Sequence, residues 1–160
     1  MKNYPIILFG LVMLLTGSLA CKTDDVTITD TNMETNDSNH IDTTSSQLKI
    51  RIGSKKFTAT LLNNAMVAAF KARLPMTVSM SELNGNEKLY RFPNNLPTSA
   101  SNPRNINSGD LMIYGSNTLV LFYQSFPTSY SYTKLGRIDD TAGLAAAVGP
   151  GSVTVTFELE

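Results

Sequence analysis

The densest group of residues suited to chemistry is a run of aromatic side chains in the C-terminal half. Six of the 13 aromatic residues fall within 19 positions: Tyr114, Phe122, Tyr123, Phe126, Tyr130 and Tyr132. Residues 126–132 mix these aromatics with Pro, Thr and Ser, so we predict a loop there. Tyrosines on a loop offer stacking area and a hydroxyl, which suits them to bind a small or extended ligand.

The candidate ligand-binding residues are therefore Tyr123, Phe126, Tyr130 and Tyr132. The alternative is that Tyr114 and Phe122 belong to a core and that the loop tyrosines only pack over the end of the fold. The sequence leaves both interpretations open.

The remaining composition argues against several catalytic chemistries. The 160 residues include one Cys, one His and no Trp, so the chain has neither an internal disulfide nor enough Cys and His ligands for a tetrahedral zinc site. His40 lies in a polar segment outside the predicted fold, so Ser-His-Asp and Cys-His catalysis are not expected. Asp139 and Asp140 precede a predicted helix and are interpreted as capping residues. We expect no metal or cofactor, and no motif indicates nucleic-acid binding.

Residues 1–20 have the pattern of an export signal. A basic start precedes the apolar run 6–15, which is about half the length of a membrane-spanning helix. The segment Ser18-Leu19-Ala20-Cys21 resembles the bacterial lipobox, which implies cleavage before Cys21 and attachment of a lipid to its thiol. A plain secretory signal and an uncleaved anchor are the alternatives.

Residues 21–46, from the expected lipidated Cys21 onward, are predicted to be a disordered acidic tether. Residues 22–46 carry a net charge of −5, and their few apolar residues are too sparse to form a core. A flexible coil of this length spans about 25–30 Å. The residues from Cys21 to Asp25 also resemble a signal for export to the bacterial surface. We expect an extracytoplasmic protein anchored to the outer membrane, on its periplasmic side or on the cell surface.

Residues 47–160 are predicted to form one domain of short strands. Alternation of apolar and polar residues predicts strands at both ends, over 48–52 and 153–159, and further strands are expected at 57–61, 76–80, 87–92, 111–114, 119–123 and 134–138. A helix is expected over 65–73, with Asn63 or Asn64 as its cap, and a second over 142–148, with Asp140 or Thr141 as its cap.

This order of elements favours a mainly β fold, a closed β-barrel of about eight strands with two short capping helices. Lys49 and Arg51 on the first strand carry the opposite charge to Glu158 on the last, which suits pairing of these two strands to close the barrel. Residues 93–108 are long for a structureless loop, and we interpret them as either a binding edge or a tolerated insertion.

Four segments, in order, resemble the bacterial cyclophilin-like domain family: ELNGNEKLY (82–90), GDLMIYG (109–115), LVLFY (119–123) and TSYSYTKLGRI (128–138). The resemblance extends over residues 47–160 and implies a cyclophilin-type barrel with helices closing its ends. It implies no particular activity, because members of the family are mostly uncharacterised.

A comparison with true cyclophilin prolyl isomerases singles out Arg91. Tyr90-Arg91-Phe92 and Gly109-Asp110 are similar to the two ends of the isomerase motif, but its Phe-Met-x-Gln centre and the pocket His and Trp have no counterpart. Isomerisation needs an apolar pocket and a donor for the twisted amide, which Arg91 could supply. The alternation in residues 89–92 also fits an arginine that simply faces solvent.

The sequence therefore predicts a lipid-anchored binding module for a peptide or small ligand. The alternative is a divergent prolyl isomerase that acts on exported proteins through Arg91. Residues 47–160 carry a net charge of +4, which gives a weak preference for acidic ligands.

Overall fold

The computed structural model describes residues 46–160. The predicted export signal, Cys21 and nearly all of the tether lie outside the described residues. The elements are β1 (Gln47–Ile52), β2 (Lys55–Leu61), α1 (Ala65–Lys71), β3 (Met76–Leu83), β4 (Glu87–Arg91), β5 (Asn105–Ile106), β6 (Asp110–Tyr114), β7 (Thr118–Phe122), β8 (Phe126–Pro127), β9 (Tyr132–Ile138), α2 (Leu144–Val148) and β10 (Val153–Leu159). Within this part of the chain no helix is long and apolar enough to cross a membrane.

Eight of the strands form a closed antiparallel barrel in the order β1-β10-β3-β4-β7-β6-β9-β2. The terminal strands lie side by side, with Lys49 opposite Glu158 and Arg51 opposite Thr156. Lys49 pairs with Glu160 at 3.3 Å, and Arg51 pairs with Glu158 at 3.5 Å. The predicted closure by the two terminal strands is confirmed.

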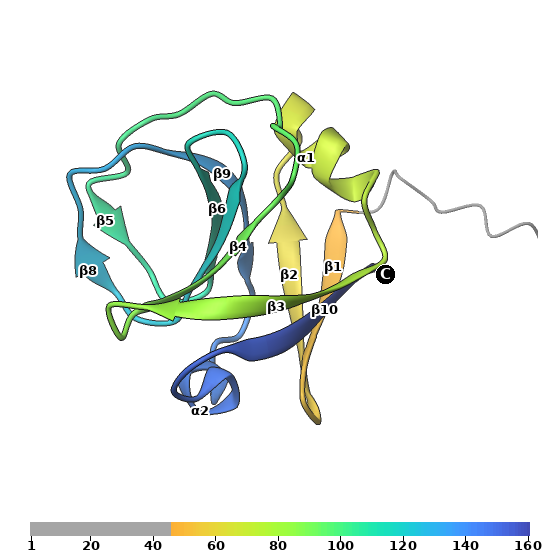
Figure 1. Cartoon of the computed structure of the whole chain (residues 1–160), viewed down its shortest axis with the longest axis vertical. Helices are drawn as coiled ribbons and strands as arrows, with labels where there is room; N and C mark the ends of the chain where they lie inside the picture. Colours follow the sequence, from red (N-terminus) through yellow and green to blue (C-terminus); the bar gives the residue numbers. More distant parts are fainter. Residues whose placement is uncertain (1–45) are drawn as a thin grey trace, which may run out of the picture. The chain divides into compact units, whose positions relative to one another are not determined.

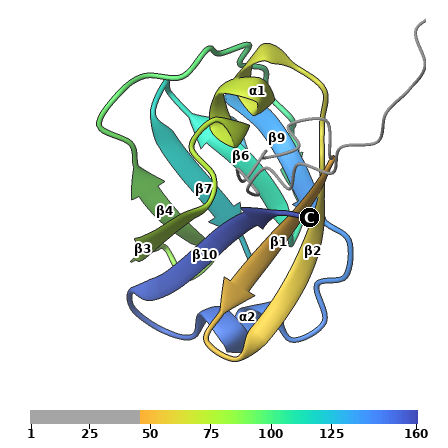
Figure 2. The ribbon, with the colours of Figure 1, turned by 90° about the vertical axis from the view of Figure 1, so that its right-hand side faces the viewer.

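The side chains that point inward from the barrel strands fill the interior of the barrel. Leu48, Ile50 and Ile52 of β1 and Val155 and Phe157 of β10 are all buried in one core. The two helices lie at opposite ends of the barrel, α1 at one and α2 at the other (Figure 2). Both contribute to the core, because residues such as Phe70 of α1 and Leu144 of α2 belong to the same cluster.

The N-terminal cap predicted from the sequence is confirmed for α1 and wrong for α2. Asn64 caps α1, since its Oδ1 accepts a hydrogen bond of 2.9 Å from the Val67 N–H. The cap predicted for α2 is wrong: α2 begins only at Leu144, and Gly143 precedes it in a left-handed conformation. Asp140 instead accepts a hydrogen bond from the Ala142 N–H, forming a turn ahead of the helix.

Residues 93–108 and 126–132 are more ordered than their sequences indicate. β5 and β8 pair with each other into a two-stranded ribbon, with Ile106 opposite Phe126. This β5–β8 ribbon lies outside the barrel, to one side of β6 and β9 (Figure 1). Its apolar residues pack on Met112, Val120 and Phe122, which point outward from β6 and β7 and form a second buried cluster. The ribbon gives one wall of the barrel a second, outer apolar layer.

Candidate functional site

Strand β4 presents different chemistry on its two faces. Because side chains alternate along a strand, Glu87, Leu89 and Arg91 share one face, and Lys88 and Tyr90 share the other. Tyr90 packs against the barrel core. Glu87, Leu89 and Arg91 instead line a cavity outside the barrel.

This outer cavity, of about 430 Å³, lies between the outer face of β4 and β7, the β3–β4 turn and residues 126–132. Its apolar lining comes from Leu89, Val120, Phe126 and Pro127. Three tyrosines line it as well: Tyr114, Tyr130 and Tyr132. Tyr114 contacts both of the others, with ring centroids 6.0 Å from Tyr130 and 5.6 Å from Tyr132. The cavity thus combines aromatic and aliphatic area with several hydroxyls.

Glu87 is the most unusual group in the lining. Its side chain is only 8% exposed, and no hydrogen bond or ion pair reaches its carboxyl group from any described residue. Burial and then the nearby negative charge of Glu82 raise the pKa of Glu87 above its ordinary value. The neighbouring Asn86 also lines the cavity, and its Oδ1 is buried without a donor. The carboxyl group of Glu87 therefore lies at the wall of the cavity without a protein donor.

Arg91 lines the same cavity, four residues further along β4. At about 3.3 Å per residue, its Cα lies about 13 Å from that of Glu87. The guanidinium is exposed and has no hydrogen bond or ion pair with any residue from 46 to 160. Arg91 therefore faces outward, as the alternation in residues 89–92 allowed, and it lies beside an apolar cavity.

Three of the four aromatic residues selected from the sequence line the outer cavity. Phe126, Tyr130 and Tyr132 do so, with Tyr130 61% exposed and Tyr132 only 6% exposed. Tyr132 is the first residue of β9 and not part of a loop, and burial, followed by the charge of Glu87, raises its pKa. Tyr123 is absent from the lining, because its hydroxyl donates a 2.8 Å hydrogen bond to Glu82.

Tyr114, Glu87 and Asn86 line the cavity but were not predicted as site residues from the sequence. Tyr114 was considered as a core residue, but it is 46% exposed and packs on Tyr130. Glu87 and Asn86 had no distinguishing motif, although a charged residue after an Asn-Gly-Asn turn, at the start of a strand, was a usable signal. Phe122, by contrast, is fully buried, as the alternative interpretation expected.

The opposite face of β4 holds a saturated polar network around Lys88. The ammonium of Lys88, 0% exposed, pairs with Glu82 and donates to the carbonyl oxygens of Gly149 at 2.7 Å and Gly151 at 2.6 Å. Although burial opposes ionisation of Glu82, its hydrogen bonds from Lys88 and Tyr123 and the charge of Lys88 hold its pKa below the ordinary value. Burial and the hydrogen bond to Glu82 raise the pKa of Tyr123 to about 12. We assign this network to the stability of the fold, because its donors and acceptors are satisfied within it.

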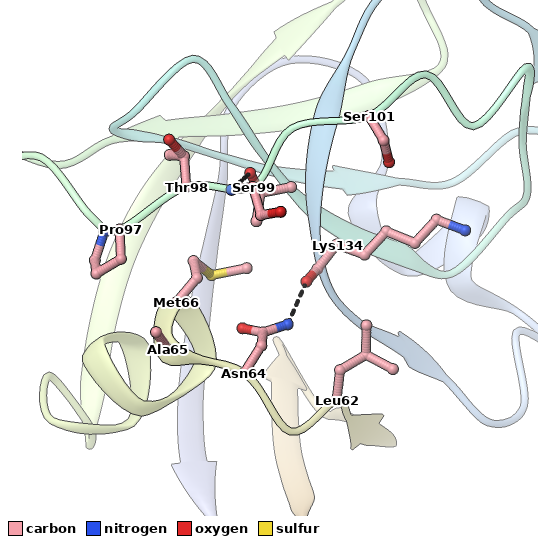
Figure 3. A pocket seen from close by; sticks show the side chains of 10 residues that line it. Leu62, Asn64, Ala65, Met66, Pro97, Thr98, Ser99, Ser101 and Lys134 are labelled. Carbon is pink, nitrogen blue, oxygen red and sulfur yellow. Dashed lines mark hydrogen bonds between the residues drawn. The ribbon is translucent and has the colours of Figure 1, made fainter.

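A second hollow, of about 260 Å³, lies between the start of α1 and residues 97–101 (Figure 3). Some of its polar groups are used internally: Asn64 Nδ2 donates to the Lys134 carbonyl at 3.3 Å, and the Ser99 N–H donates to Thr133 Oγ1 at 3.0 Å. Asn64 also caps α1, so both the oxygen and the nitrogen of its amide are occupied. Among residues 46–160, no three Cys, His, Asp or Glu side chains are grouped to hold a metal ion.

Comparison with known proteins agrees with this architecture. The chain is similar to a hypothetical protein of Archaeoglobus fulgidus whose structure was determined in solution, with 17% sequence identity and a TM-score of 0.55 over 72% of this chain and 95% of that one. At this identity the likeness concerns the fold alone. None of the curated proteins that were compared matches the chain. The cyclophilin-like family matches residues 50–158, and the chain therefore belongs to the cyclophilin-like family.

Proposed function

We propose that the barrel is a binding module that holds a peptide or small ligand in the outer cavity. The single observation that carries this proposal is the unpaired carboxyl group of Glu87, a largely buried residue that lines a cavity together with Tyr114, Tyr130 and Tyr132. Burying an ionisable group without a partner is unfavourable, and ionisable groups with perturbed pKa values cluster at functional sites.

The size and chemistry of the cavity fit this role. Its volume of about 430 Å³ falls within the usual range of roughly 300–1,000 Å³ for small-molecule sites. Leu89, Val120 and Phe126 offer apolar area, and the tyrosine hydroxyls offer polar contacts that can orient a ligand. The cavity also follows β4 over several residues, a shape that suits a short extended peptide.

A thermal-shift screen of short peptides and small molecules against the full chain in a non-ionic detergent tests this function. Tyr130→Ala should weaken a selected ligand about tenfold or more, because an aromatic contact in the cavity is lost. The exposed Tyr130 can be truncated with little effect on folding. Leu62→Ala is the matched control, since Leu62 is an exposed apolar residue outside the outer cavity. Equal affinities for both variants would contradict the proposal.

We also propose that this module is a lipoprotein, anchored through Cys21 to the outer membrane and facing an extracytoplasmic compartment. The support comes from the sequence: a short apolar run, the lipobox-like Ser18-Leu19-Ala20-Cys21, and the acidic polar segment that separates Cys21 from the barrel. A tether of this length would let the outer cavity meet partners away from the membrane surface.

The position of Arg91 favours a second candidate function, that of a divergent prolyl isomerase. Its unpaired guanidinium lines the same cavity as Leu89, Val120 and Phe126, so a donor lies beside an apolar surface that could receive a proline ring. A protease-coupled assay on proline-containing peptides tests this candidate. Rate enhancement that is lost in Arg91→Ala and kept in Arg51→Ala would support it. No enhancement over a panel of peptides would exclude it.

A further inference from the structure

We propose that the outer cavity binds the primary ammonium group of a lysine side chain in an extended peptide, with the Glu87 carboxylate as its counter-ion. This inference rests on the proposed function and specifies its ligand. It follows from the unpaired carboxyl group of Glu87, from the aromatic lining around it, and from the arrangement of charge along β4.

Glu87 differs from every other acidic residue in the described part of the chain. Residues 46–160 contain seven Asp and Glu side chains, and six have a donor: Glu82, Asp110, Asp139, Asp140, Glu158 and Glu160. Glu87 has none, although the residue is only 8% exposed. The half-exposed carboxylates of the protein are therefore paired, whereas the carboxylate of the largely buried Glu87 has no partner and lies at the wall of a cavity.

The missing partner is a donor. Glu87 in its ionised form is an acceptor, so a ligand that brings N–H groups satisfies it and a ligand that brings only acceptors does not. An ammonium group offers three donors and a positive charge, and a hydrogen bond between charged groups is the strong kind. The tyrosine rings of the lining add favourable surfaces for a cation and for the methylene groups that carry it.

The local charge around Glu87 also favours a cation, although the domain as a whole is cationic. Glu82 on β3 adds negative charge, and the hydroxyl of Tyr132, which lines the cavity beside Glu87, is neutral. The ammonium of Lys88 projects to the opposite face of β4, where Glu82 and two carbonyls hold it. The preference for acidic ligands that the net charge indicated therefore does not apply at this end of the cavity.

The arrangement along β4 identifies a peptide as the source of the ammonium group. Arg91 is unpaired, lines the same cavity and lies about 13 Å from Glu87, roughly four residues of an extended chain. A free small amine would use only the Glu87 end. A peptide laid along β4 places its lysine at Glu87 and offers a backbone carbonyl to Arg91, so both unpaired groups gain a partner.

Isothermal titration calorimetry on the full chain in a non-ionic detergent tests this inference at pH 7.5. The probes are the peptide acetyl-Ala-Ala-Lys-Ala-Ala-amide, the same peptide with norleucine in place of lysine, and n-butylamine. We expect the lysine peptide to bind about 10- to 100-fold more tightly than the norleucine peptide, the range for a hydrogen bond between charged groups. Glu87→Gln should abolish this preference. Glu158→Gln, which changes a surface carboxylate on β10, should preserve it.

Each other outcome overturns the inference in an identifiable way. Equal binding of both peptides, or a lysine preference that survives Glu87→Gln, would show that Glu87 does not recognise an ammonium group. Butylamine binding as tightly as the lysine peptide would assign the site to small amines. If neither peptide binds, the lysine inference fails, while a neutral ligand from the thermal-shift screen that depends on Tyr130 would leave the proposed function standing.

Discussion

Replacing Lys88 by Met should destabilise the barrel more than any change at an exposed lysine. The Lys88 ammonium is fully buried and joins three parts of the chain: Glu82 of β3, Lys88's own strand β4, and the turn before β10 through the Gly149 and Gly151 carbonyls. Met keeps most of the aliphatic side chain, so the change removes the charge and its hydrogen bonds and leaves little cavity.

The expected loss in the free energy of unfolding follows from the groups that lose a hydrogen-bond donor. Glu82 keeps hydrogen bonds from Tyr123 and from the Gly85 N–H, so its carboxylate remains partly satisfied. The Gly149 and Gly151 carbonyls lose a charged donor, and a hydrogen bond to a charged group contributes about 1.5–3 kcal/mol. Breaking a buried ion pair by removing one partner costs about 3–5 kcal/mol in total. We expect a loss of about 3 kcal/mol, at the low end of this range, because the variant no longer has to desolvate the lysine ammonium.

Urea denaturation of the full chain, followed by circular dichroism, measures this loss. Lys49→Met is the matched control, since Lys49 forms a half-exposed ion pair with Glu160 that contributes about 1 kcal/mol or less. A double-mutant cycle with Glu82→Gln should show coupling between Glu82 and Lys88. If Lys88→Met loses no more than Lys49→Met, the network around Lys88 does not stabilise the fold as argued.

Four further predictions follow from the same structure. Glu87→Gln should make the chain more stable than the parent at pH 8, and this difference should vanish below pH 4. The raised pKa of Glu87 means that the folded state holds the proton more strongly than the unfolded state, so the parent loses stability as the pH rises above the ordinary value of 4.5. Denaturation curves at both pH values check the sign, and a less stable variant at pH 8 would contradict it. Gly136→Ala should lower the free energy of unfolding by about 1–3 kcal/mol, because a Cβ there would collide with the Thr60 carbonyl oxygen where β9 pairs with β2. An unchanged midpoint of urea denaturation would contradict this prediction and show that the backbone moves to relieve the collision. Asn64→Ala should remove about 1 kcal/mol through loss of the α1 cap, with Asn64→Asp as the variant that keeps it. Cys21→Ser should abolish incorporation of labelled palmitate and release the protein from the membrane fraction, and retention in that fraction would contradict lipid anchoring.

Much of the fold follows from patterns that are visible in the sequence. The alternation of Leu48, Ile50 and Ile52 with charged residues is long enough to establish a strand and its buried face, and all eight barrel strands were expected near their observed positions. β5 and β8 were not expected, because a strand of two residues has no period to detect. The start of α2 was also misplaced, since Asp140 forms a local turn that has the same sequence signal as a helix cap.

The candidate site was only partly predictable. The concentration of aromatic residues selected Phe126, Tyr130 and Tyr132, because it is a property of composition. The burial of Glu87 depends instead on the packing of residues far apart in sequence, which places residues 126–132 beside β4. Tyr123 was selected for its type, yet its hydroxyl is used by Glu82, a partner 41 positions away.

The most direct test of the account is to locate a bound ligand by methyl-labelled NMR of the full chain in detergent micelles. A ligand selected by the thermal-shift screen should shift the methyl signals of Leu89 and Val120, which line the outer cavity, and leave those of Leu62 and Met66 unchanged. Shifts confined to Leu62 and Met66, in the hollow of Figure 3, would place binding elsewhere and contradict the assignment of the site to the outer face of β4.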